Sequence, residues 1–237
     1  MKRLLTTILL IPLLLVSACS TLQQIDVGDV LGSSDTLDEA TVAAGLKEAL
    51  RVGTDRTVVR TNTVDGYLGD ALLRIALPDD VQDIAGKLRQ IGLGSKVDEL
   101  EVAMNRAAEE AAGEATDLFV DAITGMTLQD AWGILQGTDT AATDYFHQKT
   151  ATTLEARYRP IVEAKLRSVG GYETYEELAA SARALPFVEA PDLDMVGYVT
   201  DHALEGLFTV LAQEEQRIRE DPVARTTDLL QRVFAAQ

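Results

Sequence analysis

From residue 35 onward, apolar side chains recur every three or four positions almost throughout the chain, which is the spacing of one helical face. Residues 36–52 are the first such segment, and Gly53 follows where a helix would end. A second short helix is predicted over 55–61, ahead of a turn at Asp65 and Gly66. The apolar positions of the first segment are Leu37, Ala40, Ala43, Leu46, Ala49 and Leu50.

The same spacing predicts helices along the rest of the chain, each bounded by glycine, proline or a capping residue. Ser95 with Asp98, and Thr127 with Asp130, have the spacing of a capping box. Pro160 falls inside the longest segment, where the lost backbone hydrogen bond is expected to kink or split the helix. The expected helices lie at about 78–91, 95–112, 114–124, 128–135, 140–169, 173–184, 192–219 and 223–235.

Residues 72–78 are ambiguous, because they could end a helix or run extended into Pro78. The residue before a proline avoids the helical region, which favours the extended form. The chain has no internal repeat of fixed period and no long heptad run. The pattern therefore predicts an all-α fold: a single domain over 35–237, built from roughly eight to ten helices.

The first 34 residues follow a different pattern. Lys2 and Arg3 precede an apolar run at 4–15, and small residues then lead to Cys19, the one cysteine of the chain. This is the architecture of a signal peptide, and the run is too short for a spanning helix. Residues 16–19 (VSAC) resemble a bacterial lipobox, in which the chain is cut before the cysteine and the cysteine is acylated. We predict a signal peptide at 1–18, lipidation of Cys19 and a flexible tether over 19–34.

The residue after the cysteine bears on the destination of the protein. By resemblance to lipoprotein sorting patterns, Ser20 in place of an aspartate favours the outer membrane. The expected location is therefore the periplasmic side of the outer membrane, with the N-terminal lipid as the contact with the membrane.

Charge narrows the range of partners. The whole chain carries a net charge of −17, and cleavage after residue 18 would leave 19 basic against 38 acidic side chains. Nucleic acids and anionic membrane surfaces would be repelled, so we expect no nucleic-acid partner and consider an envelope protein as a partner. His147 and His202 are the only histidines, and with no cysteine after residue 19 they make a structural zinc site improbable. No metal site and no cofactor is predicted, although oxygen ligands for calcium or magnesium remain available.

The sequence contains no phosphate-binding glycine loop and no nucleophile elbow, and we assign no catalytic residue. Carboxylates are the plentiful chemical groups, and enzymes that cleave glycans use a pair of them. A carboxylate-dependent hydrolase or lyase of cell-wall glycan is therefore one alternative, and a divalent-cation binder is another. The candidate carboxylates on predicted helices are Glu101, Glu109, Asp117, Asp121 and Asp130.

The most unusual polar group surrounds Asn105, which lies beside the apolar stripe of its predicted helix. Glu101 and Glu109 stand four residues to either side of it, so the three share a face. A ligand site formed by Asn105, Arg106, Glu109 and Asp121 is one interpretation. The other is that Arg106 simply pairs with Glu109 or Glu110 on the surface.

Several longer sequence segments resemble those of a bacterial family called domain of unknown function 4197. The segments are GLKEALRVGTDR at 45–56, DGYLGD at 65–70, RIALP at 74–78, MNRAAE at 104–109, GTDTAATDYF at 137–146 and IREDP at 218–222. The resemblance covers nearly all of residues 38–235 and implies an exported helical lipoprotein. It assigns no activity, so no functional residue is carried over. The resulting expectation is a lipid-anchored helical binding or scaffold protein of the Gram-negative envelope rather than an enzyme.

Overall fold

A computed structural model describes residues 39–186, 188 and 193–220. These residues form an all-helical fold in which no strand occurs, as the apolar spacing predicts. The helices belong to one compact unit, Leu37–Gln237. Their bounds are α2 Glu39–Thr61, α3 Asp79–Leu88, η1 Arg89–Leu93, α4 Gly94–Ala112, α5 Ala115–Thr124, α6 Leu128–Leu135, α7 Ala141–Ser168, α8 Gly171–Arg183 and α9 Met195–Glu220.

The described helices are fewer than the eight to ten expected when elements that adjoin without an intervening turn are counted as one run. Helix α3, the π-helical turn η1 and helix α4 adjoin one another in a run that is kinked at Gly92, whose φ of 91° is non-helical, which leaves seven runs between Glu39 and Glu220. Pro160 lies on the exposed side of α7 and does not split that helix. The expected signal peptide and tether, Asp192 and the expected helix at 223–235 lie outside the described residues.

Helix α2 corrects the prediction that Gly53 ends the first helix. The segments expected as two helices form one, which continues through Gly53 to Thr61. Gly53 is buried there, and a Cβ atom on it would lie 3.5 Å from Cδ1 of Ile218 in α9. The glycine therefore marks a close packing position against another helix. Packing of this kind overrides the weak helix propensity of glycine.

The two predicted capping boxes had different outcomes. The Thr127 side chain accepts a hydrogen bond from the Asp130 N–H at 3.1 Å, and the Asp130 carboxylate accepts one from the Thr127 N–H at 3.0 Å, which confirms the box at the start of α6. The box at Ser95 was wrong, because α4 begins one residue earlier, at Gly94, and no side chain caps its start. Asp98 instead pairs with Arg89 at 2.7 Å.

Residues 72 and 73 lie in a turn closed on the Asp70 carbonyl, and residues 74–78 are not helical, which resolves the ambiguity in favour of the extended form. Leu73, Ile75 and Leu77 are buried, and the residues between them are exposed. This alternation is that of an extended chain with one face on the core. The segment has no neighbouring strand among the described residues, so its backbone groups need side-chain partners.

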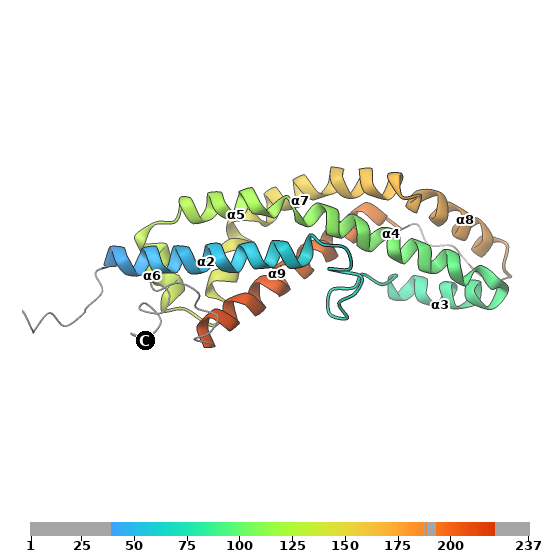
Figure 1. The fold of residues 1–237 in the computed structure, drawn as a ribbon. Coiled ribbons are helices and arrows are strands. Elements are labelled where there is room, and N and C mark those ends of the chain that lie inside the picture. The colour runs from blue at the N-terminus through green and yellow to red at the C-terminus, as the bar shows by residue number, and fades with distance from the viewer. Residues whose placement is uncertain (1–38, 187, 189–192, 221–237) are drawn as a thin grey trace, which may run out of the picture. The chain divides into compact units, whose positions relative to one another are not determined.

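Helices α2, α4, α7 and α9 pack together around the core, with α9 in contact with each of the other three (Figure 1). Helices α3 and α8 contact α4, while α5 and α6 contact α2. The largest fully buried side chains come from α4, α5, α7, α9 and the α2–α3 connection; they include Tyr67, Phe119, Phe146, Tyr158 and Leu207. Among the described helices, none is both long and apolar enough to cross a membrane.

Candidate functional site

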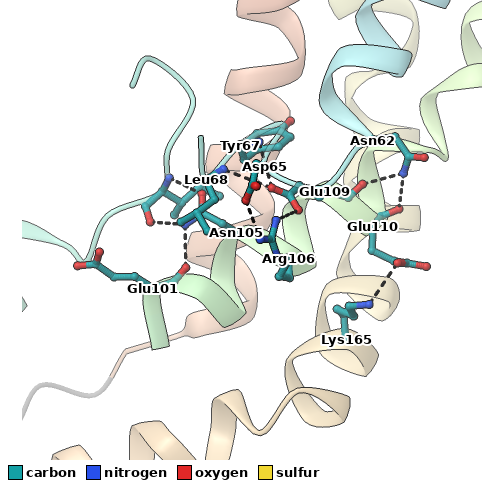
Figure 2. Close-up of polar contacts among 11 residues, drawn as sticks. Asn62, Asp65, Tyr67, Leu68, Glu101, Asn105, Arg106, Glu109, Glu110 and Lys165 are labelled. Carbon is teal, nitrogen blue, oxygen red and sulfur yellow. Dashed lines mark hydrogen bonds and ion pairs between the residues drawn. The ribbon is translucent and has the colours of Figure 1, made fainter. Parts of the chain in front are cut away.

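Helix α4 carries two polar side chains on the face that it buries. Asn105 is fully buried and Glu109 is only 5% exposed, and they lie four residues apart between alanines of the core face. Buried polar groups are costly without partners. Their partners come from the connection between α2 and α3, residues 62–78, which runs beside α4 in Figure 2.

Asn105 holds the extended part of this connection. Its Oδ1 accepts a hydrogen bond from the Ile75 N–H at 2.9 Å, and its Nδ2 donates to the Ile75 carbonyl at 2.8 Å (Figure 2). The Nδ2 group also donates to the Glu101 carbonyl at 2.8 Å. The amide thus pairs with both backbone groups of one residue, as a neighbouring strand would. An amide suits this position because it offers donors and an acceptor together.

Glu109 holds the turn at the start of the connection. One carboxylate oxygen accepts from the Tyr67 N–H at 3.2 Å and the Leu68 N–H at 3.3 Å. The other accepts from Nη1 of Arg106 at 2.6 Å. Arg106 also donates through Nη2 to Asp65 at 2.7 Å, so the guanidinium joins the helix to the turn (Figure 2). Hydrogen bonds to Glu109, and then to Asp65, raise the pKa of Arg106 above its ordinary value.

Tyr67 links the α2–α3 connection to α9. Its ring is fully buried, and its hydroxyl donates to the Ala203 carbonyl at 2.6 Å. Burial, together with the charge of Glu109, raises the pKa of Tyr67 far above its ordinary range. The ring lies against Gly206, where a Cβ atom would stand 2.5 Å from the Tyr67 Cε1 atom. Only glycine fits this position without a shift of the ring.

Asn62 completes the attachment at the end of α4. Its Nδ2 donates to the Glu109 carbonyl at 2.7 Å and to the Glu110 carbonyl at 3.3 Å. These carbonyls belong to the last turn of α4, where carbonyl groups lack helical partners. We call the set of Asn62, Asp65, Tyr67, Asn105, Arg106 and Glu109 the loop clamp. It fixes residues 62–78 against α4 and α9.

The loop clamp brings together three of the four side chains predicted to bind a ligand. Asn105, Arg106 and Glu109 converge, and Arg106 pairs with Glu109 as the structural interpretation expects. Asp121 does not join them: it is exposed on α5 and has no hydrogen bond or ion pair to those three. The polar atoms that converge are largely occupied by partners within the chain, which indicates a structural role.

The remaining candidate carboxylates are dispersed. Glu101 pairs with Arg74 at 2.9 Å, while Asp117 is exposed on α5. Asp130 caps α6, and its hydrogen bonds from the Thr127 hydroxyl and then the Thr127 N–H lower its pKa. Within the described ranges, no group of three or more acidic, histidine or cysteine side chains is arranged to hold a metal ion.

Sequence reasoning missed a second buried carboxylate of this kind. Glu215 pairs with Arg219, four residues later in α9, at 2.8 Å, and its side chain is buried. Its oxygens accept from the N–H groups of Ala142 and Thr143 at 2.9 and 2.8 Å, at the first turn of α7. A carboxylate there satisfies unpaired N–H groups and the positive end of the helix dipole.

Tyr158 on α7 is fully buried like Tyr67 but differs in its hydroxyl. That hydroxyl has no hydrogen-bond partner among the described residues. Burial, and then the nearby Tyr67 and Glu114, raise the pKa of Tyr158 well above its ordinary value. The two tyrosines therefore offer a direct comparison of a bonded and an unbonded buried hydroxyl.

Two solvent-facing hollows flank the end of α2. One, of about 190 Å³, is lined by Asn62, Thr63, Val64, Arg106, Glu109, Glu110 and Lys165. The other, of about 720 Å³, lies between α2 and α9 and is lined by Asp55, Arg56, Val59, Arg60, Glu214 and Arg217. Lys165 crosses the first by pairing with Glu110 at 3.4 Å (Figure 2). Neither hollow was anticipated, because each combines residues distant in sequence.

The geometry defines a helical protein whose distinctive feature is a non-helical connection clamped between α4 and α9. Residues 36–235 match the model of a family described as protein of unknown function, DUF4197, and the chain belongs to that family. The segments that carried the resemblance include 65–70, 74–78 and 104–109, which supply most of the loop clamp. Searches of curated proteins and of solved structures gave no match.

Proposed function

We propose that the chain is a lipid-anchored protein on the periplasmic side of the Gram-negative outer membrane, where its helical domain works as a binding or scaffold module. The observation that carries the location is Cys19, the one cysteine of the chain, behind two basic residues, an apolar run and the lipobox-like VSAC. A diacylated or triacylated cysteine anchors a protein stably without any contact from an acidic domain.

Binding is favoured over catalysis by how the carboxylates are used. Glu109 is held by two N–H groups and one guanidinium, and Asp130 by its own cap. A general acid for glycan cleavage needs a proton to give and space for a substrate beside it. The loop clamp supplies neither at Glu109, because donors already face both carboxylate oxygens.

The exposed apolar residues support a binding surface. The three most exposed large apolar side chains of the described part of the chain are Val59, Val64 and Leu72, at 73%, 73% and 74%. All three fall at the end of α2 or in the connection that the loop clamp holds. Apolar side chains on a fixed backbone lose little freedom on binding, so this segment suits recognition of a partner.

Metabolic labelling with an alkyne-tagged palmitate, followed by membrane fractionation, tests the anchor. The wild-type chain is expected to take up label and to sediment with the outer membrane, and Cys19→Ser is expected to lose the label. Ser20→Ala serves as the matched control and should keep both properties. Ser20→Asp should keep the label and move to the inner membrane. An unlabelled wild-type chain, or label that survives Cys19→Ser, would refute the proposed anchor.

A further inference from the structure

The groove between α2 and α9 concentrates positive charge on an acidic protein. Three of its six lining residues are arginines: Arg56 and Arg60 from α2, and Arg217 from α9. Helices α2 and α9 contact each other, and α9 runs obliquely to α2 in Figure 1. We call these three side chains, with Val59 and Glu214, the arginine groove.

A buried carboxylate orients two of the arginines. Glu214 is 3% exposed at the base of the groove, 3.0 Å from the Nη1 atom of Arg217 and 3.8 Å from that of Arg56. Arg60 is held separately, through 2.7 and 2.6 Å hydrogen bonds to Gln213 and Asp70. Fixed guanidinium groups lose less freedom when they bind an anion.

The guanidinium groups of Arg56 and Arg217 have N–H donors that are not used within the described residues. Each carries five N–H groups. For Arg56, the 3.8 Å ion pair is the one polar contact within the described residues, and Arg217 reaches only Glu214 there, through Nη1. Both side chains are partly open to solvent, at 33% and 51%. Their remaining donors are therefore available to a ligand from outside.

The local charge is opposite to that of the whole chain. The six lining residues include three arginines and two carboxylates, those of Asp55 and Glu214, and Asp70 outside the lining pairs with Arg60 at 2.6 Å. Counted over the lining residues alone, the groove has an excess of one positive charge, in a chain whose net charge is −17. Such a site selects carboxylates at short range although the distant field of the protein repels them, since salt screens that field.

We propose that the arginine groove binds an acidic segment of a protein partner, with partner carboxylates on Arg56 and Arg217 and an apolar partner side chain against Val59. This inference rests on the proposed binding function and specifies the class of partner. Arginine beside exposed apolar surface is typical of the residues that dominate protein interfaces. A groove of about 720 Å³ accommodates several residues of peptide.

A phosphate or lipid headgroup fits the groove less well. A single phosphate would leave most of the groove, including Val59, uncovered. An anionic bilayer would also face the net charge of −17 on the rest of the chain. Charge complementarity and the apolar side chain together favour a peptide.

Fluorescence anisotropy with the full-length protein in detergent tests the proposal. The probe is a fluorescein-labelled peptide of four Leu-Glu-Glu repeats, with a matched peptide that carries glutamine in place of glutamate. The acidic peptide should bind at least tenfold more tightly, and binding should weaken as salt rises. Arg56→Gln with Arg217→Gln should weaken it at least tenfold. Arg157→Gln with Arg159→Gln removes two exposed arginines of α7 outside the groove and should leave binding unchanged.

Loss of both arginines could destabilise the fold, because it leaves the Glu214 carboxylate buried without a partner. Two further variants keep the test decisive in that case: the double variant Arg56→Gln with Arg217→Gln combined with a third substitution, and a single substitution at Val59. Adding Glu214→Gln removes the buried charge that the arginines balance, and Val59→Glu places a carboxylate on an exposed position of the groove. Both should remain folded by circular dichroism and lose acidic binding. Equal affinity for both peptides, or binding that survives these variants, overturns the proposal.

The same variants distinguish a membrane ligand and the anchor itself. Vesicles of phosphatidylglycerol are tested with the Cys19→Ser chain, which lacks the proposed lipid. Vesicle binding that depends on Arg56 and Arg217 would overturn the proposal in favour of a lipid headgroup. Failure of peptide binding would not change the result of palmitate labelling. The proposed partner and the proposed lipid anchor can therefore be refuted independently.

Discussion

The Asn105 side chain hydrogen-bonds to both backbone groups of Ile75, thirty positions earlier in the chain, at 2.9 and 2.8 Å. One amide thereby replaces the neighbouring strand that the extended segment lacks. It also ties that segment to the face of α4 that is buried in the core. The stability of the α2–α3 connection should therefore depend on this one side chain more than on its own sequence.

Replacement of Asn105 by alanine is expected to lower the free energy of unfolding by about 2 kcal/mol, because the N–H and carbonyl of Ile75 would remain buried without partners. Urea unfolding followed by circular dichroism measures this. Gln129→Ala, at an exposed position of α6, is the control and should change stability by less than about 0.5 kcal/mol. A loss for Asn105→Ala no larger than that of the control would refute the structural role of the amide.

Gly206→Ala tests the contact between α9 and the Tyr67 ring. The added methyl group would meet the ring at 2.5 Å, and overpacking of this kind costs about 1–3 kcal/mol. Gly133→Ala is matched to it, since that helical glycine has nothing within 4 Å of its added Cβ. The control should be neutral or stabilising by up to about 1 kcal/mol, because alanine favours helix. Similar melting temperatures for the two variants would contradict the close contact.

The two buried tyrosines make a second matched pair. Tyr67→Phe removes the 2.6 Å hydrogen bond to the Ala203 carbonyl and should destabilise the fold by about 1 kcal/mol. Tyr158→Phe removes a buried hydroxyl that has no partner among the described residues, so it should be neutral or stabilising. Thermal unfolding of both variants gives the comparison. A larger loss for Tyr158→Phe would mean that its hydroxyl has a partner such as a buried water.

Asp70 should contribute to the acid sensitivity of the fold. Its hydrogen bond from Arg60, and then that from the Leu72 N–H, lower its pKa below the ordinary value of 3.8. A lowered pKa in the folded state means that the stabilisation is present above the unfolded pKa and is lost as the pH falls through the folded pKa. The contribution should be below about 1 kcal/mol, because solvent screens this half-buried pair.

Asp70→Asn should therefore be less stable than wild type at pH 7, and the difference should shrink as the pH falls below about 4. Urea unfolding at several pH values measures the two curves. Asp83→Asn, at an exposed position of α3 without an ion pair among the described residues, is the control. A difference between Asp70→Asn and wild type that stays constant down to pH 2 would contradict the assigned linkage.

Local patterns predicted the helices well, and tertiary contacts account for most of the misses. The apolar spacing located α4 to α8 to within a few residues. It failed at Gly53 because a glycine that ends a helix and a glycine that admits Ile218 look alike in sequence. It failed at Ser95 because α4 already begins at Gly94, directly after the non-helical Gly92, so Ser95 lies inside the helix and not at its cap position.

The polar cluster on α4 was recognised from the sequence, but its partners were not. Asn105 stands out because an amide on an apolar face needs an explanation, and the three-residue spacing of Arg106 and Glu109 indicates their pairing. Nothing in the sequence connects Glu109 with the N–H of Tyr67, since backbone donors have no signature of their own. Arg56, Arg60 and Arg217 were overlooked for a similar reason, as only the packing of α2 on α9 unites them.

The hold of Glu215 on the first turn of α7 joins two helix ends that are more than seventy positions apart in the chain. The amide protons of Ala142 and Thr143 can exchange with solvent only when their hydrogen bonds to the Glu215 carboxylate break. Their exchange with deuterium should therefore report on the last turns of α9 as well as on α7. These two ends form one cooperative unit of opening, although each belongs to a different helix.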